Sequence, residues 1–129
     1  MVVGRLHCLV VDCAEPRALA EFYAELLGLE LLGSGPDWAA IGAGPLSPAM
    51  SFHRVEPYRA PTWPAGTIPA QMHPDVLVDD LDEAEPRVLA LGATLLDGSD
   101  KPVGFRVYAD PAGHPFCLVT PQSVPWTVP

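Results

Sequence analysis

One pattern of apolar and polar positions occurs twice along this chain. Residues 6–11 form an apolar run of strand length, and a stretch with helical periodicity follows and ends near Gly28. Residues 76–78 open a second series of the same kind, which ends near Gly92. In the first stretch, apolar side chains recur at the spacing of one helix face: Leu19, Phe22, Tyr23 and Leu26. The pattern therefore predicts two copies of one small unit, each beginning with a strand and a helix.

Short apolar segments after each helix complete the predicted units. In the first half, strands are expected at residues 29–32, 38–41 and 49–55. In the second half, a strand at 71–78 precedes the helix, and strands at 94–96, 105–109 and 115–120 follow it. Residues 110–114 read Asp-Pro-Ala-Gly-His, which is typical of a tight turn. Each half is thus expected to run strand, helix and three strands.

The start of the second helix has two interpretations. Asp80 is a suitable N-cap, and Glu83 stands three residues later, as in a capping box. Pro86 lies six residues beyond Asp80, where proline removes a helical hydrogen bond. Either this helix begins late, near Glu85, or its first turn is distorted.

Composition limits the classes of protein to consider. The 129 residues are 49% apolar, which favours one domain with its own core: a first module at about 4–56, a linker at about 57–70 and a second module at about 71–122. The net charge of −9 argues against nucleic acid and anionic membrane surfaces as partners. The three cysteines match no disulfide framework or zinc knuckle, and no segment is long enough to span a bilayer. We therefore expect a reduced, cytoplasmic protein.

Histidine placement adds candidate chemistry to the repeat. His7 stands at the first strand of the first copy and His73 at that of the second copy, 66 residues apart. The expectation is that the two imidazoles occupy equivalent positions. Imidazole is a common ligand of divalent transition metals, so the pair suggests a metal between the copies. Taken alone, either residue could equally be an ordinary histidine within a sheet.

Three segments resemble one known group of proteins, the vicinal oxygen chelate superfamily, which includes glyoxalase I, extradiol dioxygenases and the fosfomycin and bleomycin resistance proteins. These segments are residues 22–29, 73–80 and 110–116. The resemblance implies an α+β fold of two tandem βαβββ modules that form a curled, cup-shaped mixed sheet. It also implies a homodimer, a small-molecule ligand and, in many members, a divalent metal such as zinc, manganese, iron or nickel; other members use none.

The resemblance implies ligands on the first and last strands of each module. His7 and His73 fall on the first-strand positions, whereas Cys117 occupies the usual glutamate position on the last strand. The matching position in the first module has no carboxylate, and His53 is the nearest candidate. A set of His7, His53, His73 and Cys117 would favour zinc, because thiolate is a soft ligand. The alternatives are that Cys117 is a buried apolar residue and that His53 is exposed.

Aromatic residues gather in the segments that would line the cup. Such a lining suits a flat, mostly apolar ligand, although core packing explains some of these residues equally well. Phe105 and Tyr108 have opposite parity on one strand, so only one of them can face the cup. Candidate ligand-binding residues are Trp38, Met50, Phe52, Tyr58, Trp63, Asp75, Phe105 and Tyr108.

Two functions remain open from the sequence. The first is a glyoxalase- or dioxygenase-like lyase, isomerase or dioxygenase that acts on a small oxygenated molecule through a divalent metal. The second is a metal-free protein that sequesters an aromatic natural product or antibiotic, as bleomycin resistance proteins do. The paired histidines favour the first, and the missing last-strand carboxylates favour the second.

Overall fold

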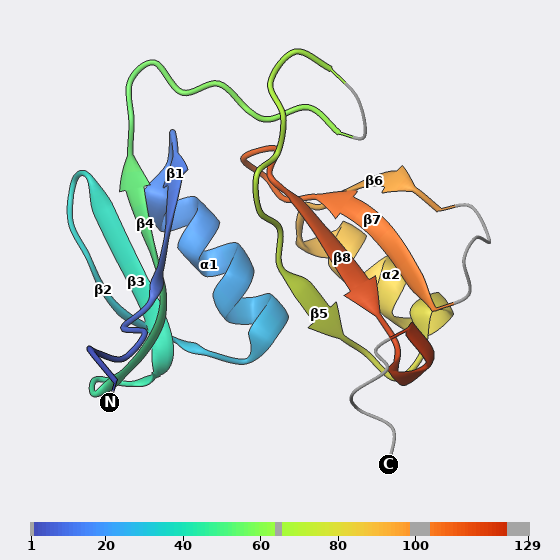
Figure 1. Ribbon diagram of the computed structural model, residues 1–129, viewed down its shortest axis with the longest axis horizontal. Helices are drawn as coiled ribbons and strands as arrows, with labels where there is room; N and C mark the ends of the chain where they lie inside the picture. The colour runs from blue at the N-terminus through green and yellow to red at the C-terminus, as the bar shows by residue number, and fades with distance from the viewer. Residues whose placement is uncertain (1, 64–65, 99–103, 124–129) are drawn as a thin grey trace. The chain divides into compact units, whose positions relative to one another are not determined.

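The computed structural model describes residues 2–63, 66–98 and 104–123. Positions 64–65 of the expected linker and 99–103 of the expected second module lie outside these ranges. The chain divides into two compact units, Met1–Arg59 and Ala60–Pro129 (Figure 1). The boundary falls within the segment that the sequence marks as a linker.

The first unit is a mixed sheet with one helix. Its strand order is β1-β4-β3-β2, with β1 parallel to β4 and the other neighbours antiparallel. The helix packs against β3 and β4. The elements are β1 (Leu9–Cys13), α1 (Pro16–Leu27), β2 (Glu30–Ser34), β3 (Trp38–Gly44) and β4 (Ser47–Arg54).

The second unit repeats this plan. Its strand order is β5-β8-β7-β6, again with one parallel pair, β5 and β8, at one side. The α+β class and the two tandem βαβββ modules are thus confirmed, with the described strands arranged in two four-stranded sheets that are not closed. The elements are β5 (Asp75–Leu77), α2 (Leu81–Leu91), β6 (Thr94–Asp97), β7 (Phe105–Ala109), β8 (Pro115–Val119) and a short 3-10 turn, η1 (Pro121–Ser123).

Capping residues fix where α2 begins and where both helices end. The Asp80 carboxylate accepts a hydrogen bond from the Glu83 N–H at 3.1 Å, so α2 begins at Leu81 and includes Pro86. The late start near Glu85 is therefore wrong. Both helices end at a glycine with positive φ, 68° at Gly28 and 118° at Gly92, as the sequence predicts.

The core of the first unit lies between its sheet and α1. The Phe52 ring is fully buried and stacks on Tyr23 of α1, with ring centroids 5.8 Å apart. Ile41 and Met50, which are register partners on β3 and β4, are buried on the same side. Alternate residues of these strands therefore face α1, and their neighbours point to the opposite side of the sheet.

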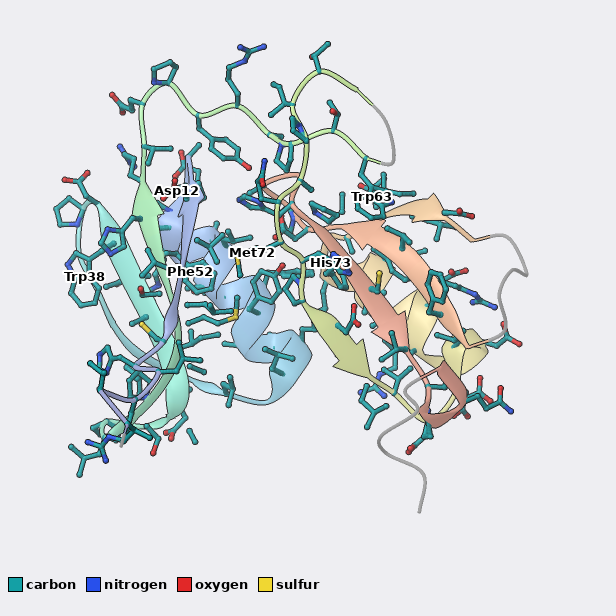
Figure 2. All side chains as sticks on the ribbon, in the orientation of Figure 1. Asp12, Trp38, Phe52, Trp63, Met72 and His73 are labelled. Carbon is teal, nitrogen blue, oxygen red and sulfur yellow. The ribbon has the colours of Figure 1, made fainter. Side chains whose placement is uncertain are left out.

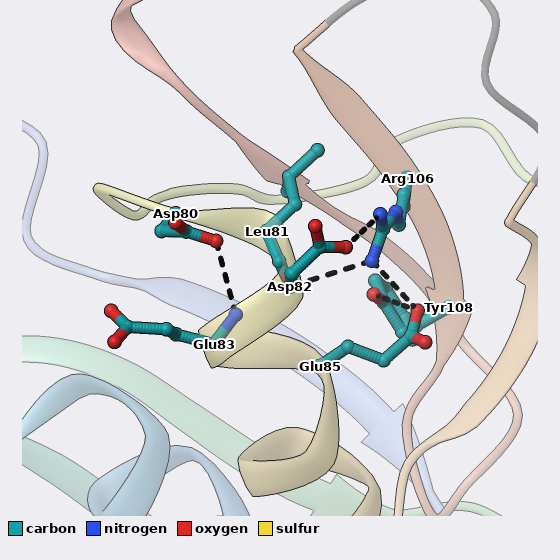
Figure 3. Close-up of polar contacts among 7 residues, drawn as sticks. All are labelled: Asp80, Leu81, Asp82, Glu83, Glu85, Arg106 and Tyr108. Atoms are coloured by element: carbon teal, nitrogen blue, oxygen red, sulfur yellow. Dashed lines mark hydrogen bonds and ion pairs between the residues drawn. The ribbon is translucent and has the colours of Figure 1, made fainter.

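The sheet of the second unit has two distinct faces. On one face, Tyr108 of β7 stacks on Phe116 of β8 and donates a hydrogen bond at 2.8 Å to Glu85 of α2. Arg106 of β7, on the same face, forms ion pairs with Asp82 and Glu85 of this helix, at 2.7 and 3.3 Å (Figure 3). These bonds tie α2 to β7. The other face carries the buried cluster of Val107, Cys117 and Val119, and we call it the site face.

Candidate metal centre

Three potential metal ligands meet on the site face of the second unit. Asp75 is the first residue of β5, and its register partner across the parallel pair is Cys117 of β8. His73 lies two residues before Asp75, just ahead of the strand. Register partners on neighbouring strands point to the same side, so the strand pairing brings carboxylate and thiol together. The backbone supports this arrangement, because the Cys117 N–H donates to the Pro74 carbonyl at 3.0 Å.

The donor atoms are close enough to act together. One imidazole nitrogen, one carboxylate oxygen and the thiol sulfur all lie within 4.8 Å of one another. The His73 Nε2 and Asp75 Oδ1 atoms are 3.3 Å apart. The side chains of His73 and Asp75 are 36% and 55% exposed, whereas Cys117 is only 6% exposed. The group therefore has a buried thiol on one side and a solvent-accessible edge on the other.

Burial and the nearby carboxylate keep the thiol protonated. Desolvation is the main cause that raises the pKa of Cys117 to about 11, and the charge of Asp75 and a side-chain hydrogen bond with it add to the shift. Both effects disfavour a second negative charge at this point. A bound dication would reverse the balance, because it stabilises the thiolate and the carboxylate together.

The donor set fits zinc. Zinc bonds of about 2.0 to 2.3 Å place tetrahedral ligands roughly 3.3 to 3.6 Å apart, and the three donor atoms lie within 4.8 Å of one another. A carboxylate and a thiolate would neutralise the two charges of the ion. Nitrogen and sulfur donors favour zinc over magnesium or calcium. Three protein ligands with a fourth position open are typical of catalytic zinc sites.

Comparison with protein families identifies the scaffold. The model of the glyoxalase-like domain family matches residues 8–119, most of the chain. The chain belongs to this family. It is thereby a member of the vicinal oxygen chelate superfamily, as the three sequence segments indicate. The comparison with curated proteins gives no match.

Solved structures of similar fold include glyoxalase-related proteins and a fosfomycin resistance protein. One is a glyoxalase/bleomycin resistance protein/dioxygenase family enzyme from Burkholderia phytofirmans PsJN, 18% identical, with a TM-score of 0.69 over 91% of this chain and 98% of that one. Another is the fosfomycin resistance protein FosX from Listeria monocytogenes, 15% identical, with a TM-score of 0.66 over 93% and 94%. A glyoxalase-related enzyme from Fulvimarina pelagi is 21% identical, with a TM-score of 0.64 over 93% and 90%. At these identities the likeness concerns the fold alone.

The two glyoxalase-like modules correspond in a register that differs from the expected one. The N-caps Glu15 and Asp80 are 65 residues apart, and the same offset relates Cys8, not His7, to His73. Cys8 Sγ lies 3.7 Å from Ser51 Oγ, and Ser51 has the parity opposite to the core residue Phe52. The expected equivalence of His7 and His73 is therefore wrong by one residue.

The other two predicted metal ligands belong to the first unit. His7 is exposed and precedes β1, and His53 is exposed on β4. His53 is the register partner of Asp12 on β1 and of Trp38 on β3, so the three residues form a row on the face away from α1. The roles of His7 and His53 as ligands stay predictions. Among the described residues, Asp75 is the third potential metal ligand beside His73 and Cys117. The sequence signal for this role is its position two residues after His73, since residues at that spacing share one face of a strand.

Several predicted ligand-binding residues lie in the cores. Met50 and Phe52 face α1, and Tyr108 is fully buried against Phe116. Core packing within each unit therefore explains the burial of these three side chains. Burial and the bond with Glu85 raise the pKa of Tyr108, which therefore remains a neutral hydrogen-bond donor. Trp38 is 43% exposed, and its indole packs over Gly33 and Gly35.

Trp63 and Phe105 lie on the site face. Both are partly buried and pack against Val107, Cys117 and Val119. Phe105 and Tyr108 thus do point to opposite faces of the sheet, as their parity predicts. Tyr58, just before the boundary between the units, is half-buried. Among the described ring contacts, Trp63 is the predicted ligand-binding aromatic that meets His73. The two ring centroids lie 5.6 Å apart (both residues are labelled in Figure 2).

Proposed function

We propose that this protein is a metal-dependent enzyme of the glyoxalase and dioxygenase type that acts on a small oxygenated molecule. The observation that carries the proposal is the convergence of His73, Asp75 and Cys117 within 4.8 Å on a glyoxalase-like module. The metal that suits this donor set best is zinc, held by these three side chains. Zinc would supply Lewis acid chemistry, polarising a substrate oxygen.

The protein groups have separate tasks in this proposal. Cys117 provides a buried anchor from the centre of the sheet, because β8 pairs with strands on both sides. His73 and Asp75 lie at the exposed edge, on an edge strand or just before it, where substrate can approach. The apolar cluster around Cys117 excludes water from the inner side. A substrate oxygen would therefore meet the site from the side of His73 and Asp75.

Metal analysis of the full chain tests the proposal. Protein purified without chelator and supplied with zinc is expected to hold one equivalent, and His73→Ala, Asp75→Asn and Cys117→Ser are each expected to lower zinc content or affinity by at least about tenfold. His114→Ala is the matched control in the same unit, since its side chain lies outside the donor group. Zinc content that is substoichiometric in the wild type, or equal in all four variants, would exclude the site.

Two first-unit variants test the larger ligand set. If His7 or His53 also binds the metal, His7→Ala or His53→Ala should weaken zinc binding as the second-unit variants do. Unchanged affinity in both would show that the site belongs to the second unit. Light scattering of the same preparations tests the homodimer that the resemblance implies.

A metal-free binding protein is the second candidate. The raised pKa of Cys117 favours it, because the thiol is protonated at neutral pH unless a metal displaces the proton. The indole of Trp63 beside the donors also suits an aromatic guest. Ligand titrations with and without zinc separate the two functions: the binding protein would take up an aromatic compound equally well in both states.

A further inference from the structure

One aromatic side chain contacts both the donor group and the buried cluster beside it. Trp63 comes from the segment between the modules and packs against the buried residues Val107, Cys117 and Val119. Its indole meets the His73 ring at 5.6 Å between centroids and an interplanar angle of 61°. Such an edge-to-face contact limits rotation of the imidazole and fixes the indole beside it. Trp63 therefore contacts the buried apolar cluster and the candidate metal ligand His73 at the same time.

The site face thus joins two kinds of surface. His73 and Asp75 are partly exposed and offer polar atoms. Trp63, which contacts His73, and Phe105 are partly buried aromatic side chains that pack against the apolar cluster. A molecule that places its oxygens at the polar edge would bring its adjoining atoms against the indole. An aromatic group there gains contact area and ring–ring interactions that a methyl group does not.

We propose that Trp63 is the specificity-determining residue of this site and selects substrates that carry a planar aromatic group beside their oxygen donors. The proposal rests on the proposed metal-dependent function and deepens it. Trp63 contacts the substrate's ring, while His73 and Asp75 face its oxygen end. Removal of the indole should remove the preference for an aromatic substrate and leave the metal in place.

A matched pair of probes tests this selectivity. Benzohydroxamate and acetohydroxamate offer the same two oxygens and differ by a phenyl ring in place of a methyl group. Each is titrated calorimetrically into zinc-loaded protein, and the ratio of the two affinities is divided by the same ratio measured for zinc in solution. We expect the corrected ratio to favour benzohydroxamate about tenfold in the wild type.

Four proteins separate the contribution of Trp63 from other effects. Trp63→Ala should lower the corrected ratio to nearly one, Trp63→Phe should retain most of the preference, and Trp38→Phe, in the first unit, should match the wild type. Far-ultraviolet circular dichroism and zinc content confirm that each variant is folded and loaded. A corrected ratio near one in the wild type, or an unchanged ratio in Trp63→Ala, overturns the proposal.

The same titrations distinguish failure of the inference from failure of the proposed function. If both hydroxamates bind zinc-loaded protein and the corrected ratio is near one, only the role of Trp63 is wrong. If the protein takes up no zinc, or neither compound binds the loaded form, the metal-dependent function is wrong and the inference falls with it. If benzohydroxamate binds zinc-free and zinc-loaded protein alike and Trp63→Ala abolishes this binding, selection by Trp63 holds and the metal-free function replaces the enzymatic one.

Discussion

Asp75 and Cys117 are register partners on the parallel strands β5 and β8, and burial together with the nearby carboxylate raises the pKa of the thiol. A buried thiol beside a carboxylate is a poor nucleophile, since the thiolate is the reactive form. The same pair becomes a good ligand pair once a dication balances both charges. The alignment of the two strands thus places the thiol where it is inert without a metal ion and would act as a ligand with one.

Asp75→Asn should make Cys117 more reactive in the zinc-free protein. The change removes the negative charge that opposes thiolate formation, so the pKa of Cys117 falls and alkylation by iodoacetamide at pH 8 accelerates about three- to tenfold. Peptide mapping by mass spectrometry follows Cys117 separately, with Cys8 as the internal control. An unchanged or slower rate at Cys117 would contradict the assigned influence of Asp75.

The free energy of unfolding should fall at alkaline pH through Cys117. Its pKa rises from an ordinary 9.0 to about 11 in the folded zinc-free protein, so the unfolded state loses this proton first as pH increases. The thiol's stabilising contribution is complete below pH 9 and is lost between about 9 and 11. Urea unfolding of wild type and Cys117→Ala across this range should show a steeper decline in the wild type. The same pH dependence of the free energy of unfolding in both proteins would refute the raised pKa of Cys117.

Zinc should stabilise the folded chain by mass action. A ligand at a hundred times its Kd adds about 2.7 kcal/mol to the free energy of unfolding if it binds only the folded state. The effect should weaken as pH falls, because protons compete for the imidazole and thiolate donors. Thermal melts with zinc and with magnesium provide the measurement and its control. Equal shifts with both ions, or a zinc shift that survives in Cys117→Ser, would argue against specific ligation.

The bonds between α2 and β7 should matter more than an exposed ion pair. Tyr108→Phe leaves Glu85 without the 2.8 Å hydrogen bond from a buried hydroxyl, and we expect it to lower the free energy of unfolding by about 1 to 3 kcal/mol. Glu21→Ala removes the Arg17–Glu21 pair, whose side chains are 59% and 60% exposed, while Arg17 keeps its hydrogen bond to Ser34, and should change stability by about 0.5 kcal/mol or less. Chemical denaturation compares the two. Similar losses would show that burial does not set the strength of these contacts.

Phe52→Ala should destabilise the first unit strongly. The ring is fully buried against Tyr23, so truncation leaves a cavity that costs about 3 to 5 kcal/mol. Trp38→Ala, on the opposite face of the same sheet, should cost markedly less because that indole is 43% exposed. Unfolding followed by circular dichroism compares the two variants. A mild effect at Phe52 would mean that it is not part of the core.

Local chemistry made most of the elements predictable. Asp80 caps α2 as expected, Gly28 and Gly92 end the helices, and the strand at 105–109 has the expected bounds. Pro74, which has no N–H for a strand ladder, lies directly before β5, an edge strand. The expected pairing of His7 with His73 was wrong by one residue, because the two histidines are 66 residues apart whereas the helix N-caps Glu15 and Asp80 are 65 apart. A one-residue error reverses the face of a strand residue.

The sequence by itself determined the repeated βαβββ plan, because periodicity, caps and turn residues are properties of neighbouring positions. It also singled out His73, Trp63 and Cys117 as candidates. Only the tertiary structure decided which of them meet. Hydrogen bonding between β5 and β8 sets Asp75 beside Cys117, which is 42 residues later in the sequence, and packing places Trp63 over the same face. Spacing along a chain cannot specify such pairings, since strand register depends on which faces become buried when the sheet assembles.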